Sequence, residues 1–137
     1  MNFKWSRDLE VGHTEIDKQH RELIRVYNNL NDICNSKTSE KEKNEKVSEA
    51  LNFLCLYTVQ HFTDEEAIQN ESGFPGFEKH KEHHEYFKNM AFFLSKKFAE
   101  VGFSEKFMDI LDNQIGAWLV SHIQKEDIQI ADYIKNK

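Results

Sequence analysis

The spacing of apolar residues constrains this chain more than any other feature. In four segments, apolar residues recur at alternating steps of three and four, the spacing that lines them up along one face of an α-helix. Polar stretches interrupt this pattern at 35–46, 70–76 and 99–104. The spacing therefore predicts helices over about 14–36, 40–70, 76–98 and 104–134, preceded by an arm at 1–12.

Four long helices with short connections favour an all-α fold, an up-down-up-down four-helix bundle with an N-terminal arm. A length of 137 residues suits a single domain over 1–137, and one proline with five glycines favours long helices. Polar residues at the expected helix starts support these boundaries. The expected caps are Thr14 with Asp17, Ser39 with Glu42, and Ser104.

Charge and composition exclude some classes of partner. The formal net charge is −6, with no basic cluster, so nucleic acid and anionic membranes are poor candidates. The longest apolar run, "LNFLCLY", is far too short to span a membrane, and the N-terminus lacks the apolar stretch of a signal peptide. Cys34 and Cys55 cannot form a disulfide framework, so we expect reduced thiols in a cytoplasmic protein. A protein partner is not indicated.

Several polar residues fall on the faces that should point inward. A single histidine at such a position is usually a hydrogen-bonded core residue, but unpaired buried polar groups cost about 1–3 kcal/mol each. In an up-down bundle, the start of the first and third helices and the end of the second and fourth meet at one end. The inward residues near these ends are His20, His61, Glu65, His80, His84 and His122. Their convergence at one end predicts a metal site.

The segment "EKHKEHHEY" contains three histidines, which do not all share a face. His80 and His84 lie on the inward line, whereas His83 is rotated by roughly 60–100° at about 100° per residue. We expect His83 on the outer face. His13 precedes the first helix and is expected to be an exposed loop residue.

Asp127 is ambiguous from spacing alone. It lies five residues after His122, which takes it off a regular helical face unless the turn is widened by a π-bulge. Otherwise it faces solvent among its polar neighbours. Five imidazoles with one or two carboxylates are too many for one divalent ion but suit two metals about 3–4 Å apart. The absence of thiolates argues against a cysteine-bound structural zinc site and against an iron–sulfur site. Imidazole and carboxylate ligands together suit iron, manganese or zinc.

Four motifs in order, "DKQH", "HFTDE", "HKEHH" and "HIQKED", resemble the hemerythrin family, in particular its single-domain bacterial members. The resemblance covers nearly the whole chain. It implies a four-helix bundle with a non-haem di-iron centre that binds dioxygen reversibly. It also implies that His80, His84 and His122 hold one iron, that His20 and His61 hold the other, and that Glu65 and Asp127 bridge both beside an oxo or hydroxo group.

The resemblance further implies that dioxygen binds at the iron with two histidines, which has an open position. Leu23, Phe62 and Leu119 resemble residues of an apolar dioxygen pocket in the family. Each is also an ordinary core residue on its own helical face.

These observations leave three functional hypotheses. The first is a non-enzymatic oxygen carrier, store or buffer. The second is a di-iron enzyme or sensor that handles nitric oxide or peroxide, which a proton-donating side chain near the open iron would favour. The third is a structural metal bundle, for example with zinc, without gas chemistry.

Overall fold

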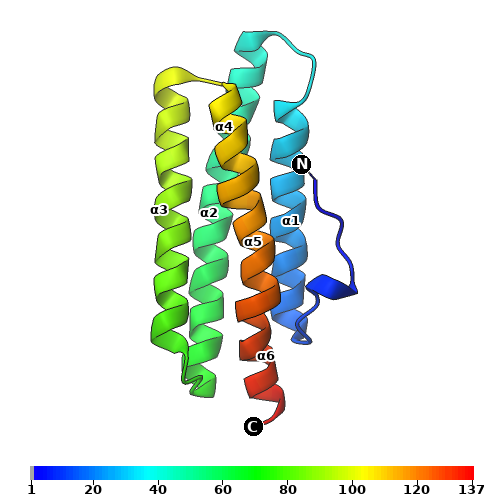
Figure 1. The fold of residues 1–137 in the computed structure, drawn as a ribbon, viewed down its shortest axis with the longest axis vertical. Coiled ribbons are helices and arrows are strands. Elements are labelled where there is room, and N and C mark those ends of the chain that lie inside the picture. Colours follow the sequence, from blue (N-terminus) through cyan, green and yellow to red (C-terminus); the bar gives the residue numbers. More distant parts are fainter. Residues whose placement is uncertain (1) are drawn as a thin grey trace.

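The computed structural model describes residues 2–137 and consists of helices packed side by side. Figure 1 shows three long helices, α1 (Thr14–Cys34), α2 (Glu40–Ser72) and α3 (Phe77–Val101), that alternate in direction and pack against a fourth, segmented helix. The predicted four-helix bundle is confirmed. No helix within residues 2–137 is long and apolar enough to cross a membrane.

The fourth helix is continuous but changes its winding twice. Its segments in chain order are α4 (Glu105–Ile110), η2 (Leu111–Gly116), α5 (Ala117–His122), η3 (Ile123–Asp127) and α6 (Ile128–Lys135), of which η2 and η3 are π-helical. Of the two alternatives that the spacing left open for Asp127, the structure has the π turn after His122. It widens the helix so that Asp127 is buried on the same inward side as His122.

Tertiary contacts accompany the other π turn, η2, which the sequence did not predict. The Tyr27 hydroxyl on α1 donates to Asp112 Oδ1 at 2.9 Å and lies 3.5 Å from the Leu111 carbonyl oxygen. Asn31 Nδ2 also donates to Asp112 Oδ1, at 3.0 Å. Gly116 at the end of η2 lets the two helices approach closely, because a Cβ there would lie 2.5 Å from Tyr27 Oη.

Side chains cap the helix starts, with one difference from the expected pattern. Ser39 Oγ accepts from the Glu42 amide at 3.2 Å and Ser104 Oγ from the Phe107 amide at 3.0 Å, as predicted. At α1, however, the cap is His13, whose Nδ1 accepts from the Ile16 amide at 3.3 Å. His13 is therefore a half-buried cap and not an exposed loop residue. Asp17 instead accepts from backbone amides of the preceding arm.

The N-terminal arm packs along α1 and includes a short 3-10 turn, η1 (Arg7–Leu9) (Figure 1). Asn28 on α1 fixes it in both directions: its Oδ1 accepts from the Phe3 amide at 2.9 Å, and its Nδ2 donates to the Phe3 carbonyl at 2.6 Å. Leu9 and Val11 are buried in the apolar core. The arm thus covers one side of the bundle near the end where the inward histidines lie.

Candidate metal centre

Seven polar side chains converge inside one end of the bundle. Each is at most 4% exposed, although histidine and carboxylate side chains rarely lie in a core without partners. They come from all four helices: His20 from α1, His61 and Glu65 from α2, His80 and His84 from α3, and His122 and Asp127 from the fourth helix. Opposite ends of neighbouring helices meet here, and this topology brings together residues up to 107 positions apart.

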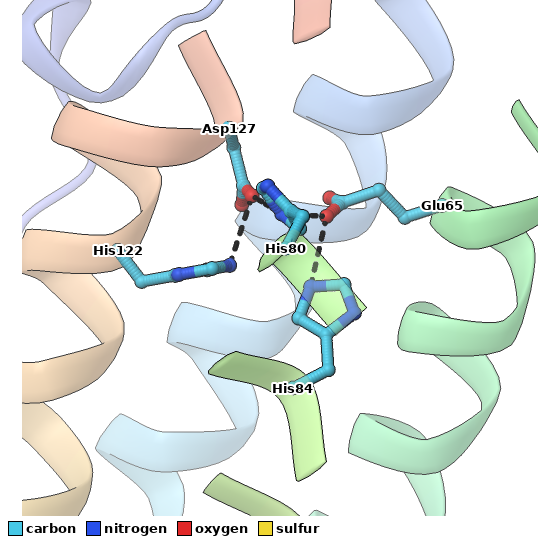
Figure 2. Close-up of side chains that lie close together, drawn as sticks. All are labelled: Glu65, His80, His84, His122 and Asp127. Atoms are coloured by element: carbon cyan, nitrogen blue, oxygen red, sulfur yellow. Dashed lines mark hydrogen bonds and ion pairs between the residues drawn. The ribbon is translucent and has the colours of Figure 1, made fainter. Parts of the chain in front are cut away.

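Glu65 and Asp127 face one another across three histidines (Figure 2). Glu65 Oε1 lies 3.0 Å from His80 Nε2 and 3.1 Å from His84 Nε2. Asp127 Oδ1 lies 2.8 Å from His80 Nε2 and 3.0 Å from His122 Nε2. One oxygen of each carboxylate is therefore directed at a group of three imidazoles.

The remaining carboxylate oxygens face the other two histidines. Glu65 Oε2 lies 3.4 Å from His20 Nε2 and 3.3 Å from His61 Nε2. Asp127 Oδ2 lies 2.9 Å from His20 Nε2. Each carboxylate thus has one oxygen toward the group of three histidines and one toward the group of two.

The donor set fits metal ions better than it fits hydrogen bonding within the protein. Several of the converging atoms are buried and, despite their short distances, have no partner in hydrogen-bonding geometry; they are the Nε2 atoms of His20, His84 and His122, Oε2 of Glu65, and both carboxylate oxygens of Asp127. Leaving so many buried polar atoms unpaired is costly. The donor atoms lie within 4.8 Å of one another in two groups, Glu65, His80, His84, His122 and Asp127, and His20, His61, Glu65 and Asp127. Imidazole and carboxylate donors at such distances can coordinate divalent or trivalent transition-metal ions.

The electrostatics of the metal-free cluster favour charged side chains. Burial alone lowers the pKa of His20, His80 and His122, but contacts with Asp127 and Glu65 outweigh burial and raise these pKa values to about 9, 9 and 10. Burial alone raises the pKa of both carboxyl groups, yet the surrounding imidazoles lower the pKa of Glu65 and of Asp127 well below their ordinary values. Without metal, protons on His20, His80 and His122 balance the two buried carboxylates.

A second layer of polar side chains contacts the outer nitrogens of three of the histidines. Gln19 Oε1 lies 2.7 Å from His61 Nδ1, Glu66 Oε2 lies 2.9 Å from His84 Nδ1, and Glu126 Oε2 lies 2.5 Å from His122 Nδ1. These residues were not identified from the sequence. Only their positions in the sequence could have indicated these contacts. Gln19 and Glu66 are adjacent to inward residues, and Glu126 lies four residues after His122 on the same helix.

His83 lies outside the converging group, at the rim of the bundle. Its Nδ1 is 2.5 Å from Glu126 Oε2, and its side chain is 37% exposed. It reaches the cluster through the carboxylate that also accepts from His122 and through its ring, which packs edge-on against the His122 ring with centroids 6.1 Å apart.

Aromatic rings pack against two of the histidines. Phe62 stacks on His84 with ring centroids 3.8 Å apart, and its edge faces His122 at 6.4 Å. Trp118 stacks on His122 with ring centroids 4.5 Å apart. Leu23 and Leu119, like Phe62, are buried in the core. Aromatic and apolar groups thus pack against His84 and His122, the two histidines with the stacked rings.

Comparison with known proteins gives a consistent result. The family model described as the hemerythrin HHE cation binding domain matches residues 11–134. Bacteriohemerythrin of Stenotrophomonas maltophilia (strain R551-3) is 32% identical over 131 residues, which cover 96% of this chain and 80% of that protein. Bacteriohemerythrin of Methylococcus capsulatus is 31% identical over 111 residues, covering 81% of this chain and 79% of that protein.

Solved structures show the same fold. A crystal structure of wild-type hemerythrin superimposes with a TM-score of 0.83 at 24% identity, over 96% of this chain and 97% of that one. The family model spans most of the chain, and the similarity to relatives extends over nearly its whole length. This chain therefore belongs to the hemerythrin family.

Proposed function

We propose that this protein binds dioxygen reversibly at a non-haem di-iron centre and acts as an oxygen carrier, store or buffer. The observation that carries the proposal is the pair of carboxylates, each with one oxygen toward three histidines and the other toward two. Two carboxylates arranged in this way are suited to bridge two metal ions.

These distances support a division of the ligands between two ions. His80, His84 and His122 would hold one iron, His20 and His61 would hold the other, and Glu65 and Asp127 would bridge both beside an oxo or hydroxo group. Because two histidines would hold the second iron and three the first, the second iron would keep an open position. Iron held in this way would supply both the electrons and the coordination position that reversible dioxygen binding requires.

The protein's own residues favour binding over further chemistry. Five neutral imidazoles and only two carboxylates give the centre less negative charge than carboxylate-rich di-iron oxidases have, which disfavours the oxidised states needed to break dioxygen. Leu23, Phe62 and Leu119 would form an apolar pocket that excludes water. Such a pocket slows loss of bound dioxygen and oxidation of the iron.

One observation favours a second candidate, a di-iron enzyme or sensor that handles nitric oxide or peroxide. The Thr58 hydroxyl is buried and has no hydrogen-bond partner. Thr58 lies three residues before His61 on α2, so it shares the inward face one turn away from the cluster. A hydroxyl without a partner there could donate a hydrogen bond to bound peroxide or nitric oxide, which the carrier function does not require.

Metal analysis combined with oxygen titration tests the proposal. The purified protein is loaded with iron, reduced under argon and titrated with oxygen, while visible absorption is recorded. Two irons per chain and an absorption band that appears with oxygen and disappears under vacuum support the carrier, store or buffer. Two irons with a band that decays at once, and turnover of an added reductant, support the enzyme. Zinc, or no metal, would overturn both candidates.

The cellular setting is also a proposal. Cys34 and Cys55 are free and buried, and burial raises the pKa of each thiol to about 11, so they are poorly reactive. Free thiols suit a reducing compartment, and we propose the cytoplasm.

A further inference from the structure

The outer nitrogens of the histidines have different partners in the two ligand groups. In the group of three, two rings contact carboxylates, whereas in the group of two no ring does so. We propose that this asymmetry makes the two metal positions electronically unequal, with Glu66 and Glu126 acting as positioning residues that favour the ferric state at the three-histidine position. The inference rests on the proposed di-iron function and adds the residues that decide which ion is oxidised first.

On the three-histidine side, two anionic acceptors lie directly behind the rings. The Nε2 atoms of His84 and His122 face the inner carboxylates, so each ring carries its proton on Nδ1 and donates it outward. Glu66 Oε2 accepts from His84 at 2.9 Å, and Glu126 Oε2 accepts from His122 at 2.5 Å. An imidazole that donates to a carboxylate is a more basic ligand, and it stabilises the more highly charged state of its metal.

On the two-histidine side, the acceptor is a neutral amide. Gln19 Oε1 accepts from His61 Nδ1 at 2.7 Å. The orientation of this amide is fixed, because its Nε2 donates to Glu15 Oε1 at 3.1 Å and to Asp64 Oδ2 at 3.2 Å. His20 Nδ1 is buried and has no hydrogen-bond partner. Neither ring therefore gains basicity from an anionic neighbour.

The consequence is an order of oxidation. When a one-electron oxidant such as ferricyanide takes an electron from the diferrous protein, the electron leaves the three-histidine ion, and that ion becomes ferric. The two-histidine ion, which has the open position, stays ferrous until a second electron is removed. The centre thus has a lower potential at the three-histidine position and a higher one at the two-histidine position.

His83 adjusts this effect because it shares one of the carboxylates. Its Nδ1 lies 2.5 Å from Glu126 Oε2, the same atom that accepts from His122. A second donor draws electron density away from the carboxylate and weakens its effect on His122. Removal of His83 is therefore expected to act in the opposite direction from removal of the Glu126 charge.

The test is a redox titration of the iron-loaded full chain under argon, with ferricyanide and dithionite, followed by the electron paramagnetic resonance signal of the mixed-valence state. Glu126→Gln and Glu66→Gln should each raise the reduction potential of the iron at the three-histidine position. We expect at least a tenfold loss of preference for ferric iron, which corresponds to about 59 mV for a one-electron couple. His83→Ala should lower the same potential. Glu85→Gln is the matched control. It also removes a carboxylate charge from a residue adjacent to His84 in the sequence, but the Glu85 carboxylate contacts Lys88 at 2.6 Å and not a histidine ring nitrogen.

A converse variant addresses the two-histidine position. Gln19→Glu combined with Asp64→Asn places a carboxylate behind His61 while keeping the local charge constant. This double variant should lower the reduction potential of the iron at the two-histidine position. The inference is overturned if the glutamine variants bind two irons with unchanged potentials, if they shift no more than Glu85→Gln, or if His83→Ala shifts the potential in the same direction as Glu126→Gln. In those cases the proposed function stands. Failure of the wild-type chain to bind two irons would instead overturn the proposed function itself.

Discussion

At the residue scale, His61 occupies the more vulnerable of the two ligand groups. Its Nε2 lies 3.3 Å from Glu65 Oε2, and it is one of only two imidazoles on that side. We predict that His61→Ala removes or severely weakens iron at the two-histidine position, because one imidazole and the shared carboxylates remain. Iron analysis of the purified variant should give roughly one ion per chain where the wild type has two. Full loading with normal oxygenation would contradict the assignment.

His83→Ala is the matched control for that experiment. His83 is also a histidine at this end of the bundle, but it contacts only Glu126 and the outer side of the His122 ring, not Glu65 or Asp127. We expect this variant to keep both irons, even though its redox potential shifts. A metal-depleted His83→Ala protein would place His83 among the ligands and remove one of the other histidines from the set.

Individual residues also show where sequence reasoning was sufficient. A rotation of about 100° per residue was enough to separate His80 and His84 from His83, because all three lie on one regular helix. The same reasoning could not find Glu66 or Glu126. Each follows or precedes an inward residue in the sequence, on a helix face that alone looks solvent-exposed. Its contact with a histidine ring, His84 for Glu66 and His122 for Glu126, depends on how the helices and their turns pack.

At the element scale, the fourth helix also has one feature that the sequence indicates and one that depends on tertiary contacts. The π turn at η3 was one of two alternatives that the spacing offered, because Asp127 could share a face with His122 only if the turn between them were widened. The π turn at η2 was not, because its apolar residues also fit a regular helix. Its contacts are tertiary: Tyr27 and Asn31 of α1 bind Asp112. Likewise, α1 begins at Thr14, where the spacing predicted the first helix to start, but its cap is His13.

Gly116 gives a prediction at this scale. A Cβ at this position would lie 2.5 Å from Tyr27 Oη, 2.6 Å from Tyr27 Cζ and 3.0 Å from a Phe3 ring carbon. Gly116→Ala should therefore push α1, the arm and η2 apart, at a cost of roughly 1–3 kcal/mol in the free energy of unfolding. The measurement is urea denaturation of the metal-free protein.

Gln114→Ala provides the control, because Gln114 lies in the same π turn with an exposed side chain. We expect its effect to remain within about 0.5 kcal/mol. A Gly116→Ala protein as stable as Gln114→Ala would show that the helices do not depend on this close approach.

At the scale of the whole molecule, the bundle concentrates its buried charge at one end. Metal ions and protons compete for the same histidines there, so the loaded and metal-free proteins should respond differently to pH. In the metal-free protein, the carboxylates Glu65 and Asp127 are balanced by protonated imidazoles, and the raised pKa values of His20, His80 and His122, about 9 to 10, express this balance.

The direction of the pH effect follows from these shifts. A histidine whose pKa is raised from 6.5 to about 9 or 10 on folding stabilises the fold fully below pH 6.5, and that stabilisation is lost as the pH rises through the folded value. For Glu65 and Asp127, whose pKa values are lowered, stabilisation is present above their ordinary range and is lost toward acidic pH. We therefore predict that the metal-free protein is most stable between about pH 5 and 6.5 and becomes less stable from there to pH 10.

Thermal unfolding followed by circular dichroism, in the presence of a chelator and at a series of pH values, measures this effect. The melting temperature of the metal-free protein should fall steadily between pH 6.5 and 10. In the iron-loaded protein, the metals replace the protons on the histidines, so the melting temperature should change little over the same interval. A metal-free melting temperature that stays constant or rises would mean that the buried carboxylates are not balanced by these imidazoles. Parallel curves for the two forms would mean that iron binds elsewhere in the molecule.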